Sequence, residues 1–177
     1  MKLHLGCGLD YKEGYVNCDI SKDIKADKRF DLEKRLPFKD NSVSEIIINH
    51  TLEHTQKPIE ILKEFYRICK DKAIIKIRVP YFSSESAFSM IDHYSFYSLT
   101  TFDCLDSNHI GHWQGVGNFK TVYKYLSWRR IFKPLEWFFN LNQKILRIYQ
   151  ELFCWWFPAK ELRIELEVNK NKEEQDK

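Results

Sequence analysis

Short apolar runs follow one another closely through the first half of the chain. They are residues 2–5, 15–19, 30–32, 45–49 and 73–79, the last of which stops at Pro80. The fourth run, EIIIN, is β-branched and uninterrupted, which is typical of a strand buried on both faces of a parallel sheet. The pattern predicts up to five strands in this half of the chain.

One segment between these runs has helical spacing instead. Within residues 57–70, Ile59, Leu62 and Phe65 recur at the intervals that place side chains on one side of a helix. Pro58 suits the first turn of that helix, because its missing N–H would have no partner there in any case. A helix between two apolar strands favours a mainly parallel sheet of the α/β class.

The second half of the chain mixes both patterns. Residues 81–118 are rich in Ser, Phe, Tyr and His and predict a helix followed by a long loop. Residues 119–126 and 162–168 alternate between apolar and polar positions, as strands do. Residues 131–157 between them hold many large apolar side chains and predict one or two helices.

The length and composition fit one globular domain. The chain has 177 residues, of which 44% are hydrophobic, enough to bury a real core. We expect a single domain over residues 1–168, with residues 131–157 inserted before the last strand and a disordered tail over residues 169–177. Five cysteines without a CxxC pair, and no signal peptide, indicate a reducing cytoplasmic location.

The front half leaves little room for helices. Only a few residues separate Gly8 from Tyr15 and Ile20 from Phe30, whereas a parallel crossover usually takes about a dozen or more. We therefore expect helices there to be shortened or missing, which would leave one face of the sheet uncovered. Residues 131–157 are the expected replacement cover, or alternatively a homodimer contact.

Charge supplies a competing interpretation for that same segment. The whole chain has a formal charge of only +3, but residues 120–163 carry nine Lys/Arg against three acids. Basic side chains interleave there with Trp and Phe, a pattern that also suits a peripheral contact with a membrane surface. The charges within residues 131–157 exclude a membrane span, which needs about 20 predominantly apolar residues.

A glycine pair near the N-terminus indicates a ligand site. Gly6 and Gly8 follow the first strand directly, where backbone can approach a ligand closely and its N–H groups can face an anionic group. Asp19 ends the next strand, where a carboxylate can accept hydrogen bonds from ribose hydroxyls. A tight turn with a surface aspartate explains the same residues. The Leu9-Asp10 that follows disfavours a P-loop, and Tyr11 disfavours a dinucleotide fingerprint.

The next segment indicates which kind of ligand site the glycine pair forms. FDLEKRLPFKDNSVSEIIINHTLEH, over residues 30–54, followed by the Pro58 helix and AIIKIRVP, resembles the class I S-adenosylmethionine-dependent methyltransferases. It is most similar to the small type 11 group that methylates metabolites, glycans and other small molecules. The resemblance covers residues 2–82 well and implies a Rossmann-like fold, with S-adenosyl-L-methionine as cofactor and S-adenosyl-L-homocysteine as product.

The resemblance also assigns roles to individual residues. Gly6 and Gly8 would lie beside the methionine part of the cofactor, and Asp19 would bind the ribose hydroxyls. Asp31 and Leu32 would border the adenine. Asn49 and His50 would face the methionine moiety and the reacting methyl. His4 departs from the family, which often has Asp or Asn there, and has no evident role.

Methyl transfer to a hydroxyl or an ammonium also needs a base. His50 is the first candidate, because strand carboxyl ends line the crevice of open α/β sheets, and His93 is the second. For each, a plain core or surface histidine remains the alternative. Cys104, His109 and His112 lack a fourth ligand at suitable spacing, so no metal is expected.

Three functions stay open on these grounds. The leading one is methyl transfer to a small-molecule or glycan acceptor. An RNA methyltransferase is favoured by the basic C-terminal part, but Asn49-His50-Thr51-Leu52 lacks the motif of enzymes that methylate base amines. A subunit that binds the cofactor without catalysis is the third, because of the departures from the family pattern.

Overall fold

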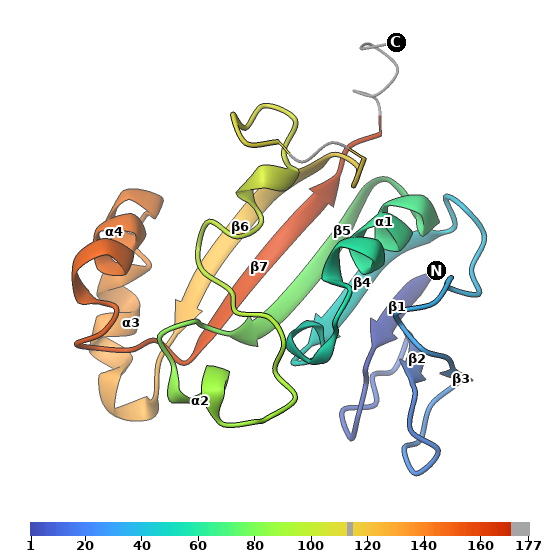
Figure 1. The fold of residues 1–177 in the computed structure, drawn as a ribbon, viewed down its shortest axis with the longest axis horizontal. Coiled ribbons are helices and arrows are strands. Elements are labelled where there is room, and N and C mark those ends of the chain that lie inside the picture. Colours follow the sequence, from blue (N-terminus) through green and yellow to red (C-terminus); the bar gives the residue numbers. More distant parts are fainter. Residues whose placement is uncertain (113–114, 171–177) are drawn as a thin grey trace.

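The protein is built on a seven-stranded sheet. The computed structural model describes residues 1–112 and 115–170 (Figure 1). The strand order is β3-β2-β1-β4-β5-β7-β6, with β7 antiparallel to both neighbours and the other pairs parallel. The strands are β1 (Lys2–Leu5), β2 (Val16–Asp19), β3 (Lys28–Arg29), β4 (Val43–Asn49), β5 (Cys69–Pro80), β6 (Phe119–Ser127) and β7 (Glu161–Val168). The prediction of a mainly parallel α/β sheet is confirmed.

Short helices connect these strands. They are α1 (Pro58–Ile68), α2 (Glu85–Phe88), α3 (Lys133–Phe139) and α4 (Gln143–Ile148), which continues into a π-helical turn at Tyr149–Phe153. Single 3₁₀ turns occupy Leu52–His54, Asp103–Leu105 and Arg130–Phe132. One predicted strand is displaced: Cys18 and Asp19 pair with Lys28 and Arg29, so the chain has already left the sheet where residues 30–32 were expected to pair.

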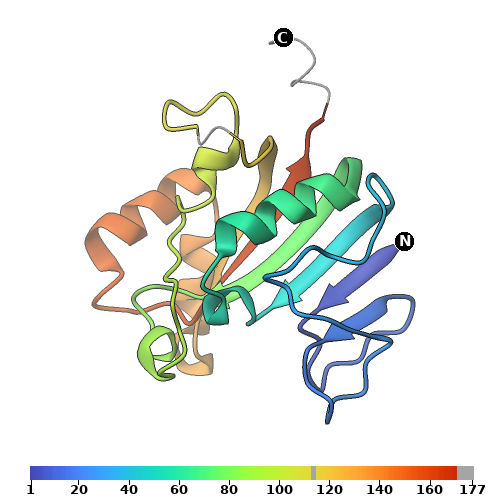
Figure 2. The ribbon, with the colours of Figure 1, turned by 45° about the vertical axis from the view of Figure 1, so that its right-hand side comes forward.

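Only one face of the sheet is well buried. Helix α1 lies against this face, as Figure 2 shows, and buries Phe65 and Ile68 there. Along β5, Ile75 and Ile77 are buried, whereas Arg78 between Ile77 and Val79 is exposed. Ile47 in β4 is half-buried, so the expectation that EIIIN is buried on both faces is wrong. The strand alternates as in a sheet with one solvated face.

Polar side chains hold the short connections at the front. The described chain between β1 and β3 has turns but no helix, as expected from the spacing. The amide of Asn17 donates to the carbonyl oxygens of Lys12 and Tyr15, and its oxygen accepts from Lys12 N–H at 2.9 Å. Asp27 accepts from Asn17 N–H at 2.7 Å. The buried ring of His4 lies 3.3 Å from the Asn17 side-chain oxygen, which gives His4 a structural role.

The segment before β7 packs against the end of the sheet. The carboxylate of Glu136 in α3 accepts from Trp128 N–H, and Asn140 pairs with both backbone groups of Leu126 at the end of β6. Gln150 accepts from Leu99 N–H at 2.9 Å. These contacts anchor the segment to β6 and to residues 81–102, rather than to the solvated face that it was expected to cover.

The structure describes only the start of the tail that was expected to be disordered. Asn169 and Lys170 donate backbone hydrogen bonds to Asn118 and Asp71, so the first two residues of the expected disordered tail are held in place. The rest of that tail, residues 171–177, lies outside the described residues. Within the described part, we find no helix with the length and apolar character needed to cross a membrane.

Candidate functional site

A cleft opens where the carboxyl ends of β1, β2 and β4 meet. Its volume is about 430 Å³. Open α/β sheets bind ligands in such a crevice. The lining residues are Gly6, Gly8, Cys18, Asp19, Ile20, Phe30, Asp31, Leu32, Glu33, His50, Thr51, His54 and Thr55. The structure therefore brings together Gly6, Gly8, Asp19, Asp31, Leu32 and His50, six of the residues that the sequence assigned to a cofactor.

The glycine loop forms one wall of the cleft. Gly6 has a φ of 62°, and a Cβ there would lie 2.2 Å from Oγ1 of Thr51, so only glycine fits without displacing the β4 end. Gly8 has a φ of 50° and open space around its Cα. Its N–H donates to Oδ2 of Asp19 at 2.8 Å, and Ser21 N–H donates to Oδ1 at 2.9 Å. Two backbone donors thus fix the carboxylate of Asp19 at the cleft.

The opposite wall combines a carboxylate with apolar surface. Oδ1 of Asp31 accepts from Glu33 N–H at 2.9 Å, a local turn that orients the side chain. Leu32 and Phe30 lie beside it and pack in part against the core. A flat heteroaromatic ring with an exocyclic amine suits such a wall, because the apolar groups contact its face and the carboxylate accepts from its edge.

Asn49 does not belong to this cleft. It lines a separate cavity with Lys76, Arg78 and Arg163. The reason is strand alternation: Ile46 and Ile48 are buried on the α1 side, and Asn49 lies on the solvated side with Ile47. Its sequence-based assignment to the cofactor is therefore not supported by the geometry.

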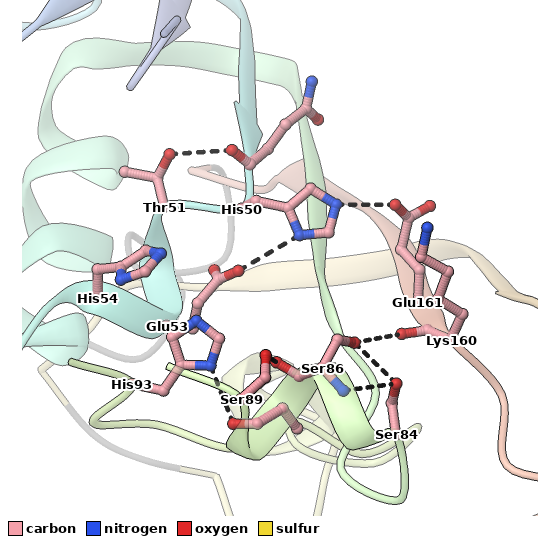
Figure 3. Close-up of polar contacts among 12 residues, drawn as sticks. His50, Thr51, Glu53, His54, Ser84, Ser86, Ser89, His93, Lys160 and Glu161 are labelled. Carbon is pink, nitrogen blue, oxygen red and sulfur yellow. Dashed lines mark hydrogen bonds and ion pairs between the residues drawn. The ribbon is translucent and has the colours of Figure 1, made fainter. Parts of the chain in front are cut away.

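His50 is held between two carboxylates (Figure 3). Its Nε2 lies 2.8 Å from Glu161 and its Nδ1 lies 3.3 Å from Glu53. The hydrogen bond to Glu161, followed by that to Glu53, raises the pKa of His50 to about 9. At neutral pH both ring nitrogens carry protons, so His50 has no lone pair with which to take a proton from an acceptor. The expectation that His50 is the general base does not fit this arrangement.

His93 has the opposite arrangement. Its Nδ1 lies 2.9 Å from the carbonyl oxygen of Ala87, which can only accept, so Nδ1 carries the proton in the neutral ring and Nε2 keeps its lone pair. The ring packs edge-on against His54 at 4.6 Å between centroids. His54 lines the cleft and donates from Nδ1 to Asp92 at 2.9 Å. His93 thus stands behind His54 with a basic nitrogen available.

Glu53 is the unexpected member of this region. It is 1% exposed, and its Oε2 has no hydrogen-bond partner among the described residues. Its other oxygen contacts His50. A buried carboxylate oxygen without a partner is costly, and in a binding site it is a ready acceptor for a ligand's hydroxyl or ammonium group.

Sequence reasoning missed Glu53 and Glu161 as neighbours of His50. Glu53 follows three residues after His50, and the 3₁₀ turn at Leu52–His54 brings its side chain back. Glu161 lies 111 residues away in the sequence. An antiparallel last strand begins where the parallel strands end, so the direction of β7 was the signal that could have placed Glu161 here.

One group of side chains could be considered for a metal ion. Among the described residues, ligand atoms of Glu53, His54 and His93 all lie within 4.8 Å of one another. Nδ1 of both histidines is already hydrogen-bonded. We interpret the group as the polar end of the cleft.

Two of three comparisons with known proteins found similar proteins. No curated protein matches the chain. Residues 3–77 match the family model described as methyltransferase domain. An S-adenosylmethionine-dependent methyltransferase from Archaeoglobus fulgidus is similar in structure, with 18% identity, a TM-score of 0.64, and coverage of 94% of this chain and 85% of that one.

Two further structures show the same fold. The YcgJ protein from Bacillus subtilis has 13% identity and a TM-score of 0.60, and covers 96% of this chain and 92% of its own. The [4+2]-cyclase SpnF has 12% identity and a TM-score of 0.60, with 95% of this chain and 75% of its own covered. The fold is therefore shared by a methyltransferase and a cyclase, two proteins with different activities.

Proposed function

We propose that the chain is a class I methyltransferase that transfers a methyl group to a small-molecule or glycan acceptor, because residues 3–77 match the methyltransferase-domain model and the fold is that of such an enzyme. The family and its relatives imply S-adenosyl-L-methionine as the cofactor and S-adenosyl-L-homocysteine as the product. The observation that carries the proposal is the cleft, because Gly6, Gly8, Asp19 and Asp31 line one volume at the carboxyl ends of the parallel strands.

The walls of the cleft suit the parts of this cofactor. The fixed carboxylate of Asp19 is the group for the ribose hydroxyls, since each of its oxygens has a second lone pair beyond its backbone partner. Asp31 and Leu32 are the groups for the adenine. The backbone near Gly6 and Gly8 leaves room for the methionine part, because glycine there has no side chain to fill the space.

The remaining residues serve the acceptor. When bound, the cofactor supplies a methyl group on a sulfonium, which leaves by in-line displacement, so the chain mainly has to align the acceptor and exclude water. His93 is the proposed base, with Nε2 taking the acceptor's proton while Ala87 holds Nδ1–H. Glu53 orients the acceptor through its unpartnered oxygen, and the charged His50 keeps Glu53 in place.

The structural similarity to a [4+2]-cyclase shows that this fold also serves other reactions. A protein that binds the cofactor without transferring the methyl is therefore our second candidate function. The two candidates agree on the cleft and differ at His93.

Calorimetry with S-adenosylmethionine tests whether the protein binds the cofactor. Radiolabelled methyl transfer into size-fractionated cell extract tests which class of molecule accepts the methyl group. Asp19→Asn should weaken cofactor binding at least tenfold, because the amide cannot accept from both backbone donors and the ribose. Asp10→Asn is the matched control on the same loop and should bind as wild type. Absence of heat and of a thermal shift at millimolar cofactor would refute both candidate functions.

His93→Gln separates the two candidates. Loss of transfer with cofactor affinity unchanged supports the proposed base, since the amide keeps the bond to Ala87 but cannot take a proton. If the wild-type protein binds cofactor but labels no fraction of the extract, the non-catalytic function is favoured. If His93→Gln transfers at the wild-type rate, another group takes the proton.

A further inference from the structure

Helix α3 buries a charged residue and exposes two of its aromatic residues. In α3, Glu136 and Phe139 are buried, whereas Trp137 is 72% exposed and Phe138 is 49% exposed. A helix on a globular domain normally turns its apolar side inward and its charged side outward. Here a carboxylate faces the domain, where it binds Trp128 N–H and the hydroxyl of Tyr125.

The segment from α4 to β7 buries Leu146 in the ordinary way but also exposes large apolar side chains. Tyr149 is buried and Gln150 is half-buried, and the side chain of Gln150 accepts from Tyr81 and Leu99. The outward positions hold large apolar groups instead. They are Ile148 at 48%, Leu152 at 64%, Trp155 at 68% and Trp156 at 79% exposed. Ile148 and Leu152 are four residues apart and therefore share one side of the helix.

The two segments form one outward surface, because Phe139 of α3 packs against Tyr149 at 4.8 Å between ring centroids and α3 and α4 lie together at one end of the sheet (Figure 1). We call it the aromatic surface and define it by Trp137, Phe138, Leu141, Ile148, Leu152, Trp155 and Trp156. Soluble domains rarely expose so many large apolar groups together without a partner.

Basic side chains surround the aromatic surface. Residues 129–160 hold six Lys/Arg and two Glu. All six basic residues are exposed, whereas one of the two acids, Glu136, is buried. Lys144 continues the outward row of Ile148 and Leu152 at four-residue spacing. Lys133 pairs with Glu136 and Arg129 pairs with Glu85, so the net positive charge of the exposed segment comes from Arg130, Lys144, Arg147 and Lys160.

We propose that the aromatic surface binds a membrane that contains anionic lipids, with the protein lying on the membrane rather than crossing it. Tryptophan is enriched at the membrane–water interface, and neighbouring Lys and Arg attract anionic headgroups. A second copy of the chain fits less well. A symmetric dimer would place the same positive side chains opposite one another, and like charges repel.

The position of the surface relates it to the cleft. The ring of Trp155 contacts Phe82 at 5.5 Å between centroids. The segment ends at Lys160, and the next residue, Glu161, binds His50 at the polar end of the cleft. If the proposed function holds, membrane binding would present the acceptor end of the cleft to a lipid-linked acceptor; this part of the inference rests on the proposed function.

Co-sedimentation with vesicles tests the membrane proposal directly. The full chain should pellet with vesicles of phosphatidylcholine and phosphatidylglycerol, bind much less to phosphatidylcholine alone, and lose binding as salt is raised. Trp155→Ser with Trp156→Ser should lower the partition coefficient roughly tenfold or more. Lys144→Gln with Arg147→Gln should lower it roughly fivefold for each charge removed.

Matched controls lie elsewhere on the surface. Leu9→Ser removes an apolar side chain that is 95% exposed at the other end of the sheet, and Lys70→Gln removes an exposed charge; both variants should bind as wild type. Circular dichroism checks that all variants fold. The proposal is overturned if vesicles do not bind the wild type, if the tryptophan variants bind equally well, or if ultracentrifugation shows a dimer that the tryptophan variants abolish without any vesicle binding.

These results are independent of methyl transfer, because vesicle binding is measured without cofactor or acceptor. Failure of vesicle binding leaves the cleft and its cofactor test unaffected. If the protein does not bind the cofactor, the membrane proposal for the aromatic surface still holds. Only the inference of a lipid-linked acceptor is then lost.

Discussion

The connections at the two ends of the sheet differ in which side chains they bury and which they expose. The β1–β2 and β2–β3 connections are short, and buried polar side chains such as Asn17 hold their backbone in place. The β6–β7 connection is long and also uses polar anchors, Glu136 and Gln150, but it turns its largest apolar groups outward.

This difference in burial shows which part of the fold each connection stabilises. At the front, Asn17 and Asp27 replace the missing helices by satisfying backbone groups near the glycine loop. At the other end, the polar anchors attach a segment whose outer side chains add little to the fold. We therefore expect the front to be sensitive to loss of polar groups and the outer tryptophans to be dispensable for stability.

Asn17→Ala should cause the largest loss, about 3 kcal/mol of unfolding free energy, because several backbone groups of residues 12–15 lose their partner and His4 loses its contact with the Asn17 oxygen. Urea denaturation measures this. Asn142→Ala removes the N-cap of α4, with bonds to Lys144 and Ile145, and should cost only about 1 kcal/mol. Equal losses for the two variants would contradict the comparison.

Tyr149→Phe should cost about 2 kcal/mol. The hydroxyl donates to the carbonyl oxygen of Phe157 at 3.0 Å and accepts from Ala159 N–H at 2.8 Å, and both partners would lose it inside the protein. Tyr123→Phe is the control, since that side chain is 45% exposed and should change stability little. Thermal unfolding of both variants gives the measurement. A loss below about 0.5 kcal/mol for Tyr149→Phe would show that this anchor is redundant.

Glu45 makes the solvated face of the sheet sensitive to acid. Burial raises its pKa, but hydrogen bonds from Lys76, Tyr15 and Lys2 outweigh burial and hold the pKa at about 2. The folded pKa lies below the unfolded value, so this contribution is present above about pH 4.5 and is lost as the pH falls toward 2. We expect about 1 kcal/mol, because the lysines are partly exposed.

Stability measured across that range, in wild type and in Glu45→Gln, checks the expectation. The variant should be less stable than wild type at neutral pH, and the gap should close as the pH falls. A gap that stays constant from neutral pH to pH 2 would assign the effect to packing instead of charge.

Trp156→Ser should have the smallest effect on folding, within about 0.5 kcal/mol of wild type, because the side chain is 79% exposed. The same denaturation experiment measures it. A loss of 2 kcal/mol or more would mean that the aromatic surface contributes to the core, and the contrast between the two ends of the sheet would disappear.

Local pattern predicted much of the fold and part of the site. The strands, the Pro58 helix and the missing front helices follow from apolar spacing and from gap lengths. Gly6, Gly8, Asp19 and Asp31 line one cleft because they lie at or just after the carboxyl ends of parallel strands. Asn49 lines a different cavity because one residue of register decides which face a side chain takes.

The hydrogen-bond partners of His50 and His93 could not be predicted from residues close to them in the sequence. His50 and His93 both lie near the cleft, but their partners come from other parts of the fold: Glu161 from the last strand and Ala87 from α2. Those partners decide which ring nitrogen carries a proton, and hence which histidine has a free lone pair.

By itself, the sequence determined the element order, the glycine loop and the basic, aromatic character of residues 131–157, because these depend on neighbours along the chain. The tertiary structure alone decided that His50 is charged, that Asn49 lies outside the cleft and that Trp155 and Trp156 face outward. Burial and proton placement depend on groups brought together from distant positions, and no local spacing encodes that contact.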